Sequence, residues 1–507
     1  MVYDTAQNRL AGYEFLISQY GLRVLPNWHR SSVKKNGTLR SGIQDGQVES
    51  CYPSAYWPGD RAVDHLEFAI KYDGVNLNIL SATFEALEEE EIERWIGSKP
   101  TSKYARRIWF LYEFLTGREL HLENLRQGNY VDLLDTNTYY AAMPGRRVQR
   151  QRVVNNLLGE REFCPLVRRT KKLAGMEEMD LAKCCEELTN SYPIDLLRRA
   201  LSYLYNKETK SSFEIEQTKP SASRTEKFIA LLQKAQQQDF CEKPLLIKLQ
   251  NSIVDSRFQD ADYRTSQNYV GQSLSHAREL VHYVCPKPSD LEELMSGLLA
   301  SHKIMSKCGL PAIVHAGVIS YGFVFIHPFE DGNGRIHRFL VHNILSLRNA
   351  IPKGLMFPVS AAILKNPALY DESLEAFSKP LMPLIEYEID DMGQMSILGE
   401  TKHLYQYMDM TAQVETLYDF VKLTIEHELV EQLDFLVSYD KTKQSIREIV
   451  DMPDGLINLF IQLCLQNKAS LSARKRESLF ASLSEEECAR MEEAVAQGFR
   501  KESSLGD

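Results

Sequence analysis

Apolar residues recur every three or four positions from Ile194 through most of the remaining chain, which is the spacing of one buried helix face. The segment IDLLRRALSYLYNKETKSSFEIE keeps this pattern throughout, so we expect one amphipathic helix over residues 194–219, ended by Pro220. The chain has 507 residues, more than one hydrophobic core usually organises. We therefore predict a mainly α protein built from three modules.

The three predicted modules differ in pattern. Residues 1–190 mix a strand-like run, YGLRVLP, with helical patterns such as EEEEIERWIGS and ARRIWFLYEFLTG, which indicates an α+β region. Residues 191–385 form a predicted helical core, in which Ser223 and Glu226 have capping-box spacing and predict the start of a second helix. Residues 386–507 are predicted to be helical, and one apolar stripe there is interpreted as core: Val414, Leu417, Val421, Ile425 and Leu429.

Composition limits the class of protein. An apolar fraction of 44% and a charged fraction of 25% are typical of globular chains. The net charge of −10 argues against a general nucleic-acid-binding protein, although the basic segment 146–172 leaves a local contact open. Nine cysteines without a CxxC pair and an N-terminus without a signal-peptide pattern favour a cytoplasmic location, with export as an effector left open. The most apolar window, Leu310 to Phe325, is shorter than the ~20 residues that span a bilayer, so we predict a buried helix and no membrane contact.

One dodecapeptide, HPFEDGNGRIHR at residues 327–338, combines groups that handle anions and protons. It lies between the apolar helix and an amphipathic pattern, so Gly332, Asn333 and Gly334 fall at a helix N-terminus, where unpaired N–H groups attract phosphate. Arg335 and Arg338 share one helix face and add positive charge. His327 has the pKa range of a general base, and Asp331 offers the single carboxylate that Mg²⁺ often takes from a protein.

A short hairpin is predicted ahead of this motif, within residues 263–285. YRTSQNYVG alternates polar residues with Tyr and Val around Gly271, and VHYVCPKP ends in two prolines. Three helices should follow: SDLEELMSGLLASHKIM, PAIVHAGVISYGFVFI, and the segment that the motif opens.

The dodecapeptide resembles the signature of the Fic family, HPFx(D/E)GNGRxxR, with each specified position present. The resemblance implies an all-helical core with a short β-hairpin flap, and transfer of AMP from ATP to a Ser, Thr or Tyr hydroxyl of a target protein. It also implies self-modification. Family members that transfer phosphate usually carry lysine at the second glycine, so Gly334 favours AMP transfer.

The resemblance implies a role for each motif residue. His327 would deprotonate the target hydroxyl and Asp331 would bind Mg²⁺. Gly332, Asn333 and Gly334 would cradle the α- and β-phosphates of ATP, while Arg335 would hold the β-phosphate and Arg338 the γ-phosphate. The hairpin would be the flap that pairs with an extended target segment by strand addition. Tyr370 resembles a position lining the adenine pocket, with an ordinary core tyrosine as the alternative.

Many Fic proteins carry an inhibitory helix with the pattern (S/T)xxxE(G/N), whose glutamate pairs with the second arginine of the motif. Ser212 and Glu216 fit this spacing just ahead of the predicted core, whereas Ser81 and Glu85 fit it far upstream. We favour Glu216 as the inhibitory residue. Gln217 departs from the family pattern, and the alternative is that Glu216 is an ordinary surface glutamate.

Other functions stay open on the sequence. A Fic-like site can remove AMP from a modified protein, with an inhibitory glutamate positioning water, or can use another nucleotide. A third reading is a toxin–antitoxin-like regulatory binding module. The target protein, the roles of the terminal regions and assembly into a homodimer are not defined by sequence pattern.

Overall fold

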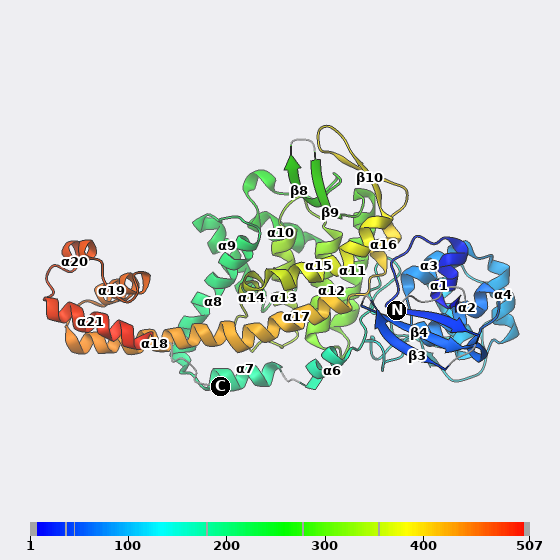
Figure 1. The fold of residues 1–507 in the computed structure, drawn as a ribbon, viewed down its shortest axis with the longest axis horizontal. Helices are drawn as coiled ribbons and strands as arrows, with labels where there is room; N and C mark the ends of the chain where they lie inside the picture. The colour runs from blue at the N-terminus through cyan, green and yellow to red at the C-terminus, as the bar shows by residue number, and fades with distance from the viewer. Residues whose placement is uncertain are drawn as a thin grey trace.

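The computed structural model describes residues 8–35, 38–44, 46–178, 181–275, 278–352 and 355–500. Figure 1 shows three bodies in a row: the N-terminal module, a central helical body, and a small C-terminal helical bundle at the end of a long helix. Three hydrophobic clusters of the described residues correspond to these bodies. The predicted mainly α architecture is confirmed.

The N-terminal module is α+β. Its four-stranded sheet has the order β1-β2-β4-β3, in which β2 and β4 are parallel and the other neighbours are antiparallel. The predicted strand YGLRVLP is wrong, because residues 22–27 form an irregular segment between α1 and β2. The elements are β1 Asn8–Ala11, α1 Tyr13–Tyr20, β2 His29–Lys34, β3 Arg40–Gln44, β4 Gln47–Pro53, α2 Ala62–Phe68, α3 Leu77–Ala86, α4 Glu89–Ser98, α5 Lys103–Thr116, β5 Val131–Asp132, β6 Arg146–Val148 and β7 Val153–Asn155.

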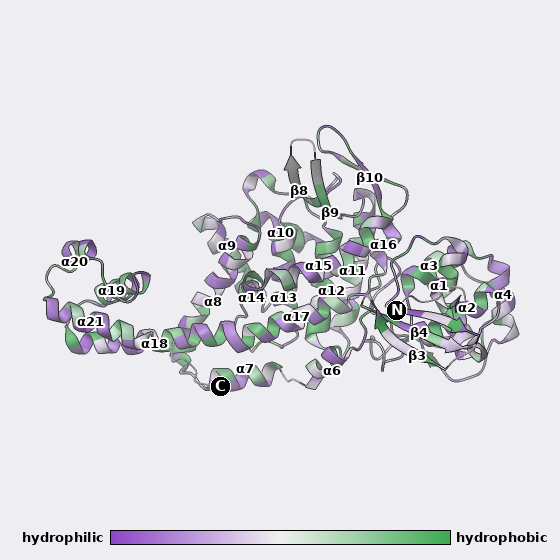
Figure 2. Ribbon diagram, viewed as in Figure 1, coloured by the Kyte–Doolittle hydropathy of each residue, from purple (hydrophilic) through white to green (hydrophobic). Residues whose placement is uncertain are grey.

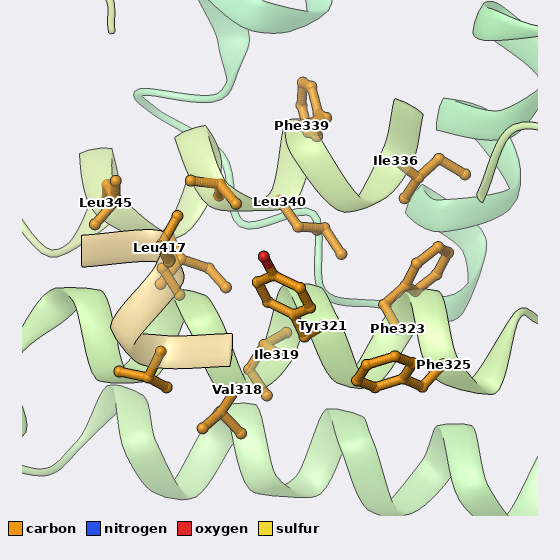
Figure 3. Close-up of a cluster of buried hydrophobic side chains, with 14 of the residues drawn as sticks. Val318, Ile319, Tyr321, Phe323, Phe325, Ile336, Phe339, Leu340, Leu345 and Leu417 are labelled. Atoms are coloured by element: carbon orange, nitrogen blue, oxygen red, sulfur yellow. The ribbon is translucent and has the colours of Figure 1, made fainter. Parts of the chain in front are cut away.

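The central body is built around α12 (Ala312–Ile326), which is buried along nearly its whole length, as predicted. Figure 3 shows Tyr321 of this helix pointing toward Leu340 of α13, while Val318 lies on the opposite side of α12 from α13. None of the helices in the described ranges is long and apolar enough to cross a membrane. The other central elements are α6 Lys171–Glu178, α7 Leu181–Asn190, α8 Ile194–Ile215, α9 Ala222–Lys234, α10 Lys243–Ile253, β8 Tyr269–Ser275, β9 Arg278–Val284, α11 Leu291–Ser306, α13 Asn333–Leu347, α14 Val359–Lys365 and α15 Pro367–Leu381.

Helix α8 ends earlier than predicted. It stops at Ile215, before Pro220, because Gln217 adopts a left-handed conformation with φ 52°. The Gln217 N–H donates to the Glu214 carbonyl (2.9 Å) and the Thr218 N–H to the Phe213 carbonyl (3.1 Å), which is the Schellman pattern of a helix end. The next helix is also capped differently from the prediction.

Ser221, not Ser223, is the N-cap of α9. Its side chain accepts a hydrogen bond from the Arg224 N–H, so the helix begins at Ala222. The extended backbone directly after Pro220 places Ser221 in the cap geometry two residues before the predicted capping box.

The C-terminal part begins with a hairpin that the sequence patterns did not predict, β10 Glu386–Ile389 and β11 Met395–Leu398. Helices α16 Lys402–Gln406, α17 Thr411–Leu423 and α18 Val430–Ile449 follow, and the stripe from Val414 to Leu429 is buried in the central cluster, as predicted. Helix α18 is banded with polar and apolar residues and runs out to the distal bundle (Figure 2). That bundle consists of α19 Asp454–Gln466, α20 Ala473–Leu479 and α21 Glu485–Gly498.

Candidate active site

The dodecapeptide forms the turn between α12 and α13. His327 is the C-cap of α12 in a left-handed conformation (φ 53°), and Gly332 is the N-cap of α13 with φ 94°. The Asn333 side chain accepts from the Phe329 N–H (3.1 Å) and donates to the Phe329 carbonyl (2.7 Å). The buried Asn333 amide therefore closes the loop, and the backbone around it remains available to an anion.

The imidazole of His327 is set up to accept a proton. Its Nδ1 lies 3.1 Å from the Val324 carbonyl, which can only accept, so Nδ1 carries the hydrogen and Nε2 has the lone pair. Burial, reinforced by the positive charge of Arg264, lowers the pKa of His327 to about 4, although the Val324 carbonyl, Glu216 and Asp331 pull it upward. The ring is consequently neutral at physiological pH.

A candidate anion site lies at the N-terminus of α13. Arg335 and Arg338 are both almost completely buried there, and the first lies over the ring of Phe213. Arg335 Nε and Arg338 Nη1 are buried and have no hydrogen-bond partner within the described residues. Two donors without partners next to a helix N-terminus are suited to phosphate oxygens.

Asp331 lies at the mouth of this site, and its side chain is 53% exposed. Its Oδ1 accepts from the Gly332 N–H and from Arg335 Nη2, each at 2.6 Å. Those bonds orient the carboxylate through Oδ1, and no hydrogen bond to Oδ2 is formed within the described residues. One such oxygen beside a phosphate site suits a hard cation.

The Glu216 carboxylate reaches this anion site from the end of α8. It accepts a hydrogen bond from Arg338 Nη2 at 2.8 Å. A Cβ atom built on Gly334 would lie only 2.2 Å from Glu216 Oε1, so the carboxylate sits against the helix N-terminus itself. Ser212 completes the contact, since Arg338 donates to its hydroxyl (3.1 Å) and to its carbonyl (2.7 Å).

The second candidate for this position lies elsewhere. Glu85 belongs to α3 in the N-terminal module and pairs with Arg118 at 3.3 Å. Of the two segments with the same spacing, Ser212 to Glu216 is the one whose glutamate contacts Arg338.

The remaining predicted site residues are located as follows. Tyr370 of α15 is buried in the central cluster with its ring 6.0 Å from His337, and burial raises its pKa to about 12. The predicted hairpin is present as antiparallel strands β8 and β9, while residues 276 and 277 of its turn lie outside the described residues. Gly271 is inside β8, next to a register shift between Val270 and Gly271.

Two features could not be read from the sequence. Arg264 binds the backbone of the motif and of the hairpin, yet its partners are carbonyls, which leave no trace in a sequence. Part of the basic segment 146–172 is paired, because Arg150, Arg168 and Lys172 contact carboxylates at 3.0, 2.8 and 2.5 Å.

Parts of this chain are similar in sequence or structure to known proteins. Residues 240–345 match the Fic/DOC family. A protein from Aedes aegypti named protein adenylyltransferase Fic is 29% identical over 168 residues, 32% of this chain and 30% of that protein. A protein of the same name from Nematostella vectensis is 37% identical over 87 residues, 16% of this chain and 17% of that protein. The aligned segments thus span less than a third of either relative. The crystal structure of a Fic family protein from Desulfovibrio desulfuricans G20 covers 65% of this chain and 84% of its own, at 17% identity and a TM-score of 0.36.

Proposed function

Because residues 240–345 match the Fic/DOC family, we propose that this chain is a self-restrained protein adenylyltransferase that transfers AMP from ATP to a hydroxyl of a target protein. The observation that carries the proposal is the meeting of three groups in one turn: the neutral imidazole of His327, the N-terminus of α13, and two buried arginines. A binding module alone has no need of a base beside a phosphate site.

The reaction follows from this arrangement. The target hydroxyl oxygen attacks the α-phosphorus of ATP while His327 Nε2 takes the hydroxyl proton. The bond between that phosphorus and the oxygen bridging to the β-phosphate breaks, and pyrophosphate leaves. Nucleotidyl transfer depends mainly on positioning and on neutralising charge, which the backbone N–H groups of α13 and Arg335 would provide. Tyr, Ser and Thr side chains can all supply the attacking oxygen.

The residues present fit a Mg²⁺ ion. Asp331 Oδ2 is the carboxylate oxygen that would hold it, because Oδ1 is already bound by Gly332 and Arg335. The ion would neutralise phosphate charge next to the helix N-terminus. Arg335 would still orient Asp331 when the ion is bound, since their hydrogen bond uses the other oxygen.

Self-restraint is proposed from the position of Glu216. Its carboxylate takes the place of an anion at Gly334 and engages Arg338, the arginine proposed for the γ-phosphate. ATP bound beside it would lack that arginine and would be held with its α-phosphate displaced. Residues 269–284 are proposed to hold the target segment as a flap.

The deciding experiment compares transfer of label from α-³²P and γ-³²P ATP, with Mg²⁺, to the full chain itself. Glu216→Gly should raise labelling from the α-position roughly ten- to a hundredfold, towards the lower end because Glu216 is 35% exposed and solvent screens the pair. Glu85→Gly is the matched control and should equal the wild type. Glu216→Gly combined with His327→Ala should fall to background.

The outcomes separate the candidate reactions. Label arriving from the γ-position would indicate phosphate transfer instead of AMP transfer. If the Glu216→Gly, His327→Ala double variant were active, His327 would not be the general base. If Glu216→Gly stayed silent with every nucleoside triphosphate, the transferase proposal would be wrong.

A further inference from the structure

Arg264 is a buried arginine directly behind the catalytic loop. The residue is 4% exposed, and burial lowers its pKa. Its Nε donates to the His327 carbonyl and its backbone N–H to the Pro328 carbonyl, both at 2.8 Å. Within the described ranges no carboxylate forms an ion pair with it, so its charge is held by backbone carbonyls.

The other two nitrogens of the same guanidinium bind the two ends of the flap. Nη1 donates to the Ser266 carbonyl ahead of β8, and Nη2 donates to the Pro286 carbonyl after β9, each at 2.6 Å. One planar, rigid group thus connects the start of the motif with the segments that precede and follow the hairpin. A lysine could not do this, since its ammonium is a point donor on a flexible stem.

Arg264 binds the backbone of His327, the proposed general base, whose position determines whether it can reach the target hydroxyl. His327 has φ 53°, a conformation that residues other than glycine rarely adopt, and its carbonyl must be held for the ring to face the phosphate site. We propose that Arg264 is a positioning residue that keeps the His327 base in register with the flap, and hence with the hydroxyl of a target segment lying on it. This inference rests on the proposed function, in which His327 is the general base and the hairpin is the flap that holds the target segment.

Arg264 also acts on the base electrostatically. The charged groups around His327 are Arg264, which lowers its pKa, and Glu216 and Asp331, which raise it. Removing the Arg264 charge makes the protonated imidazole less unfavourable, so the pKa of His327 should rise from its value of about 4. Proton acceptance requires the neutral ring, and the acid limb of the pH profile should therefore move to higher pH.

The test uses the full chain carrying Glu216→Gly, so that transfer is measurable. Arg264→Met removes both the charge and the planar set of donors, and Arg264→Lys restores the charge alone. Arg257→Met is the control at an exposed arginine whose ion pair, among the described residues, is with Asp255. We expect Arg264→Met to lower kcat about a hundredfold, the cost of misplacing a reacting group. The KM for ATP should stay within about twofold, because the phosphate site is untouched.

Two further readouts separate positioning from simple support of the fold. The acid limb of kcat/KM should move to higher pH in Arg264→Met and stay in place in Arg264→Lys, while kcat should be low in both. Arg257→Met should match its parent. If kcat and ATP affinity fell together in Arg264→Met with the acid limb unmoved, or if kcat stayed near that of the parent, the inference would be overturned.

One further measurement does not require AMP transfer, so it tests the inference even if the proposed function is wrong. The His327 ring can be titrated by NMR with histidine labelled at Cε1, its signal identified by loss in His327→Ala. Arg264→Met should raise the measured pKa and Arg264→Lys should leave it near that of the parent. An unmoved His327 titration in Arg264→Met would overturn the inference even if the chain transfers no AMP.

Discussion

His327 combines a strained backbone with a fixed ring. Its Nδ1 is engaged by the Val324 carbonyl, so the only part of the side chain offered to a substrate is Nε2. The proposed phosphate contacts belong to α13 and to the arginines rather than to this ring. Binding of ATP and transfer of AMP should therefore respond differently to a change at this position.

His327→Asn should bind ATP like its parent and transfer about 10²–10⁴-fold less AMP, the usual contribution of a general base. Asparagine is the better substitution here because it tolerates the left-handed backbone (φ 53°) that alanine does not favour. Isothermal titration calorimetry with ATP measures binding, and labelling assays measure AMP transfer, both in the Glu216→Gly chain. Weak ATP binding in His327→Asn would show that the residue supports the loop rather than the chemistry.

A separate prediction concerns Asp331 as the proposed Mg²⁺ ligand. Asp331→Asn keeps an oxygen for the Gly332 N–H and for Arg335 but loses the charge on the second oxygen. The Mg²⁺ concentration for half-maximal labelling should rise roughly 10–100-fold, the scale on which metal sites respond to loss of their supporting groups. A Mg²⁺ titration of Asp331→Asn against its parent measures this. Undiminished labelling of the parent in EDTA would contradict the assigned ion.

The end of helix α8 explains why the inhibitory pattern favours glycine or asparagine after the glutamate. The residue after Glu216 must adopt a left-handed conformation to close the Schellman motif, and here it is Gln217 at φ 52°. A side chain at such a position costs roughly 1–2 kcal/mol that glycine avoids. The end of α8 is therefore less stable with glutamine at position 217 than it would be with glycine there.

Gln217→Gly should tighten the contact between Glu216 and Arg338. Glycine relieves the backbone strain, but its greater freedom in the unfolded chain offsets part of that effect. The restrained state should be stabilised by about 1 kcal/mol, which raises its occupancy near fivefold. Amide hydrogen exchange over residues 212–218 should slow and basal labelling should fall. Gln217→Ala keeps the Cβ and should change neither, and faster exchange in Gln217→Gly would contradict the argument.

Local pattern predicted some elements and missed others for identifiable reasons. The long helices and the turn at residues 327–338 follow from spacing within one segment. The choice of Glu216 over Glu85 follows from its position just ahead of the predicted core, since both segments have the same spacing. Strands β2 and β3 read HRSSVK and RSGIQ, which are too polar to show an alternating apolar face, so they were not predicted. Arg264 depends on three backbone carbonyls brought together only by the fold.

The chain as a whole links the proposed brake to its far C-terminal end. Helix α18 packs along the first half of α8, where Leu196 and Ala200 meet Leu433 and Leu436 in one buried cluster. Ion pairs flank this cluster, including Arg199 with Asp440 at its exposed edge. The contact lies on α8 more than three turns before Glu216, and α18 continues into the distal bundle beyond the central body (Figure 1).

Loosening this contact should release the brake from a distance. Leu433→Ala leaves a cavity at a fully buried position, which typically costs 2–5 kcal/mol, and part of that loss falls on the seating of α8. Basal labelling should rise several-fold, whereas Ile461→Ala, an equally buried truncation inside the distal bundle, should leave it unchanged. In the Glu216→Gly chain, Leu433→Ala should add nothing, because the restraint it weakens is already gone. A further increase there, or an equal increase from Ile461→Ala, would mean that α18 does not act through α8. The distal bundle could then not be coupled to transfer by this helix pair.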